Sequence, residues 1–265
     1  MNMVRRGGRR TLGMEPLESR LAMAGDVSLF VSDGNLRIVG DTASNDISIV
    51  QTAVGEFSIV GNAGESFRLD DVPMTGPVTL GGITKTITMQ LGRGNDAVSV
   101  TGLADVVTAS RLFVFSGPGA DRVSVSSARI GGQLSISTGN GDSSADGDIV
   151  SITDVTVAGP LIVETGAGND SVAIDGVTAR RVGVNTSIGE DTVSIAATSA
   201  VSFDSLLLSL GFGRDTLTIG AGTLSLSKDR SRVVGGPGDD SFSGQANLTE
   251  GSLARLAVDG FETVS

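Results

Sequence analysis

The chain lacks cysteine, histidine, tryptophan and tyrosine, and it has only nine phenylalanines among its 265 residues. Without cysteine it can form neither disulfides nor thiolate metal sites. Without histidine it has no imidazole zinc site, no Ser-His triad and no imidazole acid–base chemistry. The scarcity of aromatic residues, set against 38 glycines, argues against a core of large side chains. The core must therefore be built from Val, Ile and Leu.

The charge is distributed unevenly along the chain. The formal net charge is −11, yet residues 1–24 carry five arginines against two glutamates, so the remainder is strongly acidic. An acidic body repels nucleic acid and anionic lipid and attracts cations, so we expect no nucleic-acid partner. No run of about 18 apolar residues is present, and we therefore expect no transmembrane helix.

The N-terminal residues 1–24 read as a separate basic leader or export segment. Ala22-Met23-Ala24 has the small-x-small pattern of a signal-peptidase site, but the apolar stretch expected before such a site is missing. The sequence EPLESRL (15–21) resembles the LEPR-XLL type segment of large secreted or surface proteins of planctomycete bacteria. The resemblance implies a secreted or cell-surface location with β-rich repeats after the segment, and it implies no enzymatic activity.

A motif of glycines followed by aspartate recurs at spacings of 21 to 27 residues along most of the chain. The copies are LGRGNDAVSV (91–100), SGPGADRVSV (116–125), ADGDIVSI (145–152), TGAGNDSVAI (165–174), IGEDTVSI (188–195), LGFGRDTLTI (210–219) and GGPGDDSFSG (235–244). Their aspartates are Asp96, Asp121, Asp148, Asp170, Asp191, Asp215 and Asp240. Self-similarity at this period is typical of a solenoid.

Branched aliphatic residues accompany each motif with a period of two. One pair follows the aspartate, as Val172 and Ile174 follow Asp170, and a second pair precedes it, as Leu161 and Val163 do. A period of two places both members on one face of a strand. With a looser third segment, such as 155–159 or 223–227, two such strands make one coil of a parallel β-helix.

The predicted fold is therefore all-β, a parallel β-helix (β-solenoid) of about seven coils of about 24 residues over residues 76–245. One inward column should contain Val123, Val150, Val172, Val193 and Leu217. Residues 25–75, with a hairpin signal at Asp33-Gly34, should form an N-terminal β-meander cap. Residues 246–265 depart from the repeat and should form a C-terminal cap.

The turns also resemble those of the repeat-in-toxin family. GGPGDDSFS (235–243) fits that family's nine-residue pattern G-G-x-G-x-D-x-U-x, with U a large apolar residue, and four other copies lack only the first glycine. The family's turns bind calcium through these aspartates and through backbone carbonyls. The resemblance implies calcium as a candidate cofactor. The candidate ligands are Asp96, Asp121, Asp170, Asp215 and Asp240, joined by the equivalent Asp148 and Asp191.

Elementary physics leaves two explanations of these aspartates open. Coils about 4.8 Å apart would stack equivalent carboxylates into a like-charge column, in which neighbours repel by roughly 1 kcal/mol even in water. Calcium bound between successive carboxylates would offset that repulsion with hard oxygen ligands. Alternatively, the aspartates only make turns, because Asp and Asn side chains accept hydrogen bonds from nearby backbone N–H groups.

The function predicted from these features is a non-enzymatic structural or adhesive module, secreted or on the cell surface. Calcium ions and components of the cell envelope or extracellular matrix are its candidate partners. A polysaccharide-acting parallel β-helix enzyme is the alternative, but such sites use clustered carboxylates or bases and aromatic platforms. The chain has no Tyr, Trp or His, and its only lysines are Lys85 and Lys228.

Overall fold

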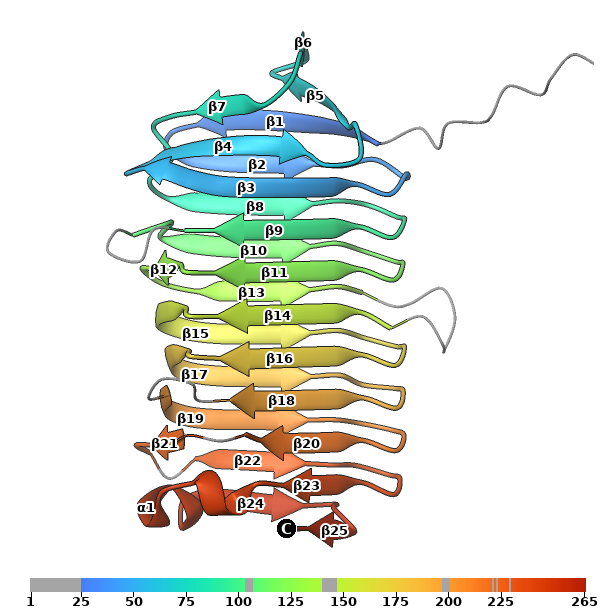
Figure 1. Ribbon diagram of the computed structural model, residues 1–265, viewed down its shortest axis with the longest axis vertical. Helices are drawn as coiled ribbons and strands as arrows, with labels where there is room; N and C mark the ends of the chain where they lie inside the picture. Colours follow the sequence, from blue (N-terminus) through green and yellow to red (C-terminus); the bar gives the residue numbers. More distant parts are fainter. Residues whose placement is uncertain are drawn as a thin grey trace, which may run out of the picture.

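The computed structural model describes residues 25–102, 107–139, 147–196, 201–220, 222, 224–228 and 230–265. Strands stack along one long axis, and successive coils place one strand in each of two sheets that face each other (Figure 1). The predicted all-β parallel β-helix is confirmed. The predicted leader, residues 1–24, lies outside the described residues, as does most of the insertion before Asp148.

The two sheets, called sheet A and sheet B here, contain most of the described strands. Sheet A contains, in stacking order, β6 (Val72–Met74), β5 (Ser66–Leu69), β1 (Asp26–Ser32), β2 (Asn35–Val39), β8 (Thr86–Gln90), β10 (Arg111–Phe115), β13 (Leu134–Ser137), β15 (Thr156–Glu164), β17 (Thr178–Asn185), β19 (Val201–Ser209), β22 (Ser231–Val234) and β24 (Leu256–Asp259). Beside it, β12 (Arg129–Ile130) pairs with β15, and β21 (Leu224–Leu226) pairs with β19. Sheet B contains β7 (Val78–Leu80), β4 (Glu56–Gly61), β3 (Asp46–Ala53), β9 (Ala97–Thr101), β11 (Arg122–Ser126), β14 (Ile149–Thr153), β16 (Ser171–Asp175), β18 (Thr192–Ala196), β20 (Thr216–Ile219), β23 (Ser241–Ser243) and β25 (Thr263–Val264).

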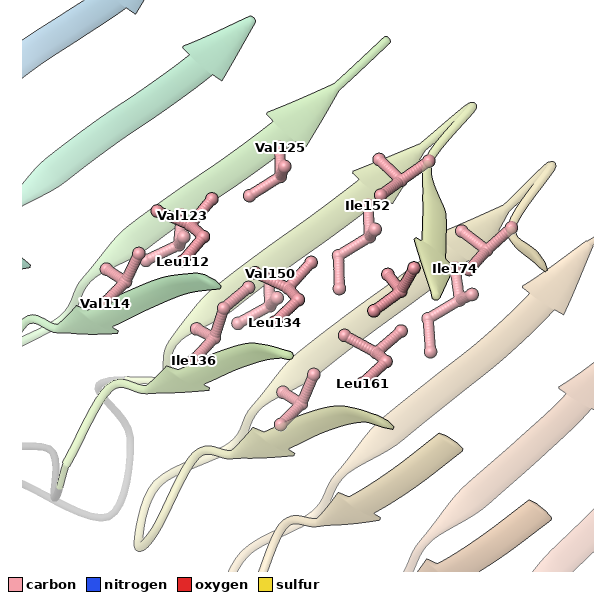
Figure 2. Close-up of a cluster of buried hydrophobic side chains, with 14 of the residues drawn as sticks. Leu112, Val114, Val123, Val125, Leu134, Ile136, Val150, Ile152, Leu161 and Ile174 are labelled. Carbon is pink, nitrogen blue, oxygen red and sulfur yellow. The ribbon is translucent and has the colours of Figure 1, made fainter. Parts of the chain in front are cut away.

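The core consists of in-register columns of aliphatic side chains between the two sheets. The predicted column is confirmed, since Val123, Val150, Val172, Val193 and Leu217 pair in register from one sheet B strand to the next. All five are buried. Figure 2 shows such side chains from both sheets pointing toward one another, among them Val150 and Leu134. The alternation predicted from the sequence therefore sets which side chains enter the core.

A third segment closes each coil, as the sequence predicts. Val157 in the segment 155–159 is buried and lies at the start of the long strand β15. Leu224 and Leu226 in the segment 223–227 are likewise buried and form β21. This side of the solenoid is less regular because its strands are short or continue directly into sheet A.

The parallel stack extends into both ranges predicted as caps. At the N-terminal end, β2 and β3 already pair in parallel with β8 and β9. Beyond them lie β1 and β4 to β7, whose pairings are antiparallel except for that of β1 with β5. Asp33 and Gly34, with φ of 50° and 80°, form the predicted hairpin turn between β1 and β2. At the other end, β24 and β25 pair in parallel with β22 and β23, while the short helices η1 (Gln245–Asn247) and α1 (Glu250–Leu253) lie on the third side.

The motif glycines allow the turns of successive coils to stack closely. Gly211 and Gly213 have φ of 108° and 148°, in the left-handed range that favours glycine. A Cβ atom at Gly213 would overlap the backbone carbonyl oxygen of Gly189 in the preceding coil. The glycines that precede each aspartate are therefore required by the contact between coils as well as by the backbone conformation.

Replacing Gly213 by alanine should lower the free energy of unfolding by about 2–4 kcal/mol, because the added methyl group meets backbone at an unfavourable φ. Urea unfolding followed by circular dichroism measures the change. The matched control is Gly183→Ala in sheet A, where the nearest atom to an added Cβ is the Leu207 carbonyl oxygen at 4.0 Å. Equal effects of the two substitutions would contradict the close-stacking explanation.

Candidate functional site

The seven predicted aspartates form one column, the aspartate ladder, along the edge where the chain turns into sheet B. Each one immediately precedes a sheet B strand, as Asp96 precedes β9 and Asp170 precedes β16. Every member is at most 2% exposed. The structure thus brings all seven candidate residues together in single file, one in each coil, inside the fold.

Backbone hydrogen bonds to the carboxylates connect the ladder from coil to coil. In each step, the N–H of one aspartate donates to Oδ1 of the aspartate one coil further along the chain. The N–H to Oδ1 distances are 2.8 Å for Asp96 to Asp121, 2.8 Å for Asp121 to Asp148, 2.7 Å for Asp148 to Asp170, 2.8 Å for Asp170 to Asp191, 2.9 Å for Asp191 to Asp215 and 2.9 Å for Asp215 to Asp240. Each carboxylate therefore accepts a hydrogen bond from a backbone N–H group of the preceding coil. That N–H group is buried, and leaving it without an acceptor would cost free energy.

Two further residues extend the ladder, and the sequence analysis missed both. At one end, the backbone N–H and side-chain Nδ2 of Asn45 donate to Asp96 Oδ1 at 2.8 and 3.2 Å. At the other end, the N–H of Asp240 donates to Glu262 Oε2 at 2.6 Å. Pairing of Ile47 with Val98 and of Val264 with Phe242 places both residues at the ladder position. Strand register is the signal that identifies these two residues. Aligning Asn45-Asp46 with Asn95-Asp96 by sequence alone would have placed Asp46, and not Asn45, at the ladder position.

The environment of the second carboxylate oxygen, Oδ2, differs from coil to coil along the ladder. In one group of coils a threonine precedes the turn, and the Thr138 hydroxyl donates to Asp148 Oδ2 at 2.5 Å. In the coils of Asp96, Asp215 and Asp240, a leucine or glycine occupies that position. The Oδ2 atoms of these three aspartates are buried and have no hydrogen-bond partner within the described part of the chain. The same holds for the Oδ2 atoms of Asp170 and Asp191, whose coils do have the threonine. A charged carboxylate is poorly stabilised in such a place.

Burial accordingly raises the pKa values of the ladder. Desolvation is the largest cause, and it raises the pKa of Asp96 to about 6 and those of Asp148 and Asp191 to about 7. The charges of the adjacent aspartates raise the pKa of Asp148 further, while its hydrogen bonds oppose the shift. Desolvation also raises the pKa values of Asp170, Asp215 and Asp240. These shifts favour the protonated form of the buried carboxyls relative to a solvent-exposed aspartate.

The structure shows a role that the turn-making explanation did not include, because each Oδ1 accepts a backbone N–H of the preceding coil and not one within its own turn. Calcium takes six to eight oxygen ligands. Each turn supplies one ladder carboxylate, whose Oδ1 already accepts a backbone N–H, and the turn glycines are explained by coil stacking. Within the described ranges, no group of three or more acidic, His or Cys side chains could hold a metal ion. Calcium binding by the ladder stays a prediction of the family resemblance, open to direct measurement.

We expect the melting temperature of the protein at neutral pH to be the same in millimolar calcium and in excess chelator. A ligand that binds only the folded chain would add about 2.7 kcal/mol at a hundredfold excess over its Kd, so real binding would be obvious. Differential scanning calorimetry provides the measurement. A calcium-dependent rise that disappears in Asp215→Asn/Asp240→Asn would contradict a ladder held by hydrogen bonds alone and support the calcium ligands implied by the resemblance.

The outer face of sheet A has two adjoining shallow hollows. One, of about 240 Å³, lies over Gly183 between the side chains of Ile162 and Leu207, and the other is about 270 Å³. Glu164 lines both hollows and is the only carboxylate among the residues that line them. Glycoside hydrolysis commonly uses a pair of carboxylates, and these hollows do not supply such a pair.

Comparisons with other proteins add no family assignment. Among the described residues, no helix has the length and apolar character needed to cross a bilayer. The chain matches no protein-family model, and no significantly similar curated protein or solved structure was found.

Proposed function

We propose that the chain is a non-enzymatic structural module, a stiff rod that holds other components at a fixed spacing outside the cell. The observation that carries this proposal is the aspartate ladder. The residues with the strongest perturbation of pKa are buried and hydrogen-bonded to the neighbouring coil, where they join coils and are withheld from any substrate. Carboxyl groups with strongly shifted pKa values often indicate a catalytic site, but structural hydrogen-bond networks shift the pKa values of carboxyl groups too.

The shape and surface of the solenoid are consistent with this role. Each coil contacts its neighbours through two sheets and the ladder, so bending the rod would disturb all three. The outward positions of sheet B are mostly small and uncharged, as at Ser124, Ser151 and Ser194. Such a surface suits lateral contacts over a long face better than it suits chemistry at one point.

The proposed location, secreted or on the cell surface, rests on the resemblance of residues 15–21 to an export-associated segment. The proposed partners are components of the cell envelope or extracellular matrix. Both follow from the sequence and are tested together with the structural role.

The test is deletion of the gene in the native host, followed by complementation. Protease treatment of intact cells should digest the protein, which tests the location. The deletion should weaken the envelope or cell–cell adhesion, and the core variant Val172→Asp should fail to restore it. Glu164→Gln and Arg181→Gln, which remove the charges beside the hollows of sheet A, should restore it fully.

Two results would overturn the proposal. One is complete protection of the protein in intact cells, which would place it inside. The other is a polysaccharide-cleaving activity of the purified full chain that Glu164→Gln abolishes without changing its thermal stability, which would favour the enzyme alternative.

A further inference from the structure

Two phenylalanines lie side by side on the outer face of sheet A. Phe113 and Phe115 are two residues apart on β10, so both point away from the core, and Phe115 is 42% exposed. Their ring centroids are 6.5 Å apart and their ring planes differ by 20°, so the rings lie nearly parallel. The chain has only nine phenylalanines, and this pair places two of them where they do not contribute to the core. The two rings, called the phenylalanine pair here, offer an apolar surface to solvent.

Hydrogen-bonding side chains border the phenylalanine pair on both sides. Strand register places Thr88 and Gln90 of β8 beside the rings on one side, and Ser135 and Ser137 of β13 on the other (Figure 1). The Gln90 Oε1 atom accepts hydrogen bonds from Arg37, at 3.3 Å from Nε and 2.9 Å from Nη2. These two bonds hold the amide group in place, and its Nε2 group stays available to a ligand. An apolar surface with a few fixed polar groups around it is typical of a binding site.

The same surface is positively charged, although the net charge of the chain is −11. Arg37 on β2 and Arg111 on β10 are exposed there, and β2, β8, β10 and β13 contain no acidic residue. Among the described residues Arg111 has no ion-pair partner, and the partner of Arg37 is a neutral amide. At an ionic strength of about 0.1 M, charges more than about 10 Å away are largely screened. A ligand on this surface therefore interacts with the two arginines more than with the acidic rest of the chain.

We propose that the phenylalanine pair, together with Arg37 and Arg111, binds an acidic polysaccharide. The apolar C–H faces of the sugar rings pack on Phe113 and Phe115, and the sugar hydroxyls bond to Gln90 and the neighbouring serines. The carboxylate or sulfate groups of the polysaccharide pair with the two guanidinium groups, which can each donate two parallel hydrogen bonds.

The geometry of the stack suits an extended polymer. Successive coils are about 4.8 Å apart, which is close to the length of one sugar residue, so successive sugars meet successive coils. Charge complementarity favours a polymer with acidic groups over a neutral one. This inference rests on the structural role proposed above, because it supplies the chemical class of the envelope or matrix component that the rod holds.

Isothermal titration calorimetry of the full chain at physiological ionic strength tests the binding. The probes are polygalacturonate, which carries carboxylates, and dextran sulfate, and at least one of them should bind. Phe115→Ala and Arg111→Gln should each weaken that binding about tenfold, since one removes a stacking surface and the other a charge. Both side chains are exposed, so the melting temperature should stay nearly unchanged.

The matched controls are Phe212→Ala on a turn and Arg122→Gln on the outer face of sheet B. Both side chains are exposed and lie away from the phenylalanine pair, so both variants should bind like the wild type. Binding of neither acidic probe would overturn the proposal, as would binding that Phe115→Ala and Arg111→Gln leave unchanged.

Two further probes test the class of the ligand. Neutral dextran should bind at least tenfold more weakly than the acidic probe, and equal binding would contradict the role of the arginines. Tighter binding of a single-stranded oligonucleotide or of phosphatidylglycerol vesicles would overturn the assignment to a polysaccharide. Failure of polysaccharide binding would leave the deletion phenotype proposed above intact, so the two proposals fail separately.

Discussion

Raising the pH from 5 to 8 should lower the free energy of unfolding by several kcal/mol. The ladder aspartates have folded-state pKa values raised from 3.8 to about 6 or 7, so the folded chain binds more protons than the unfolded chain between these values. Stability conferred by this proton uptake is fully present below about pH 4 and is lost as pH rises through about 7. Each such group changes the free energy by about 1.4 kcal/mol per pH unit inside that window.

Urea unfolding at a series of pH values measures this dependence. The matched variant is Asp148→Asn, whose amide oxygen can still accept the Asp121 N–H but cannot titrate. We expect this variant to fold and to show a smaller pH dependence than the wild type. Stability that rises from pH 5 to 8 would show that the aspartates are charged and stabilised in the fold.

The second large effect is expected from Val172→Asp, which should abolish folding. Val172 is 1% exposed, and it lies between Val150 and Val193 in the inward column. An aspartate there would bury an unpaired charge, at a cost of several kcal/mol in a fold whose total stability is usually about 5–15 kcal/mol.

The matched control for Val172→Asp is Ala173→Asp on the same strand. Ala173 points to the outer face of sheet B and is half-buried, so its aspartate can reach water. Circular dichroism should show β-structure and cooperative melting for Ala173→Asp and neither for Val172→Asp. Similar melting of the two variants would contradict the inward column.

The fold was predictable because its determinants are local and repeated. The alternation of large aliphatic and small residues, as in Val172-Ala173-Ile174, indicates which side chains face inward. The glycines indicate where the chain turns. These two signals gave the coils, the column and the hairpin at Asp33-Gly34. They did not give the limits of the stack, because β2, β3, β24 and β25 join it with sequences that lack the glycine motif.

The chemistry of the ladder was less predictable than its position. The partner of each Oδ1 atom is a backbone N–H in another coil, 21 to 27 residues away, and such a contact leaves no local signal. The aspartates also follow glycines with positive φ, where simple alternation no longer tells which way a side chain points. For the same reason Asn45 and Glu262 were missed, since only strand register places them in the column.

Residue-specific amide hydrogen exchange in Asp148→Ala tests the ladder most directly. The substitution removes the acceptor of the Asp121 N–H but leaves the N–H of residue 148 bonded to Asp170 Oδ1. Exchange by NMR should therefore accelerate at Asp121, one coil before the mutation, while the amide at 148 stays protected. Unchanged protection at Asp121, or equal loss at both amides, would contradict the claim that each carboxylate holds the preceding coil.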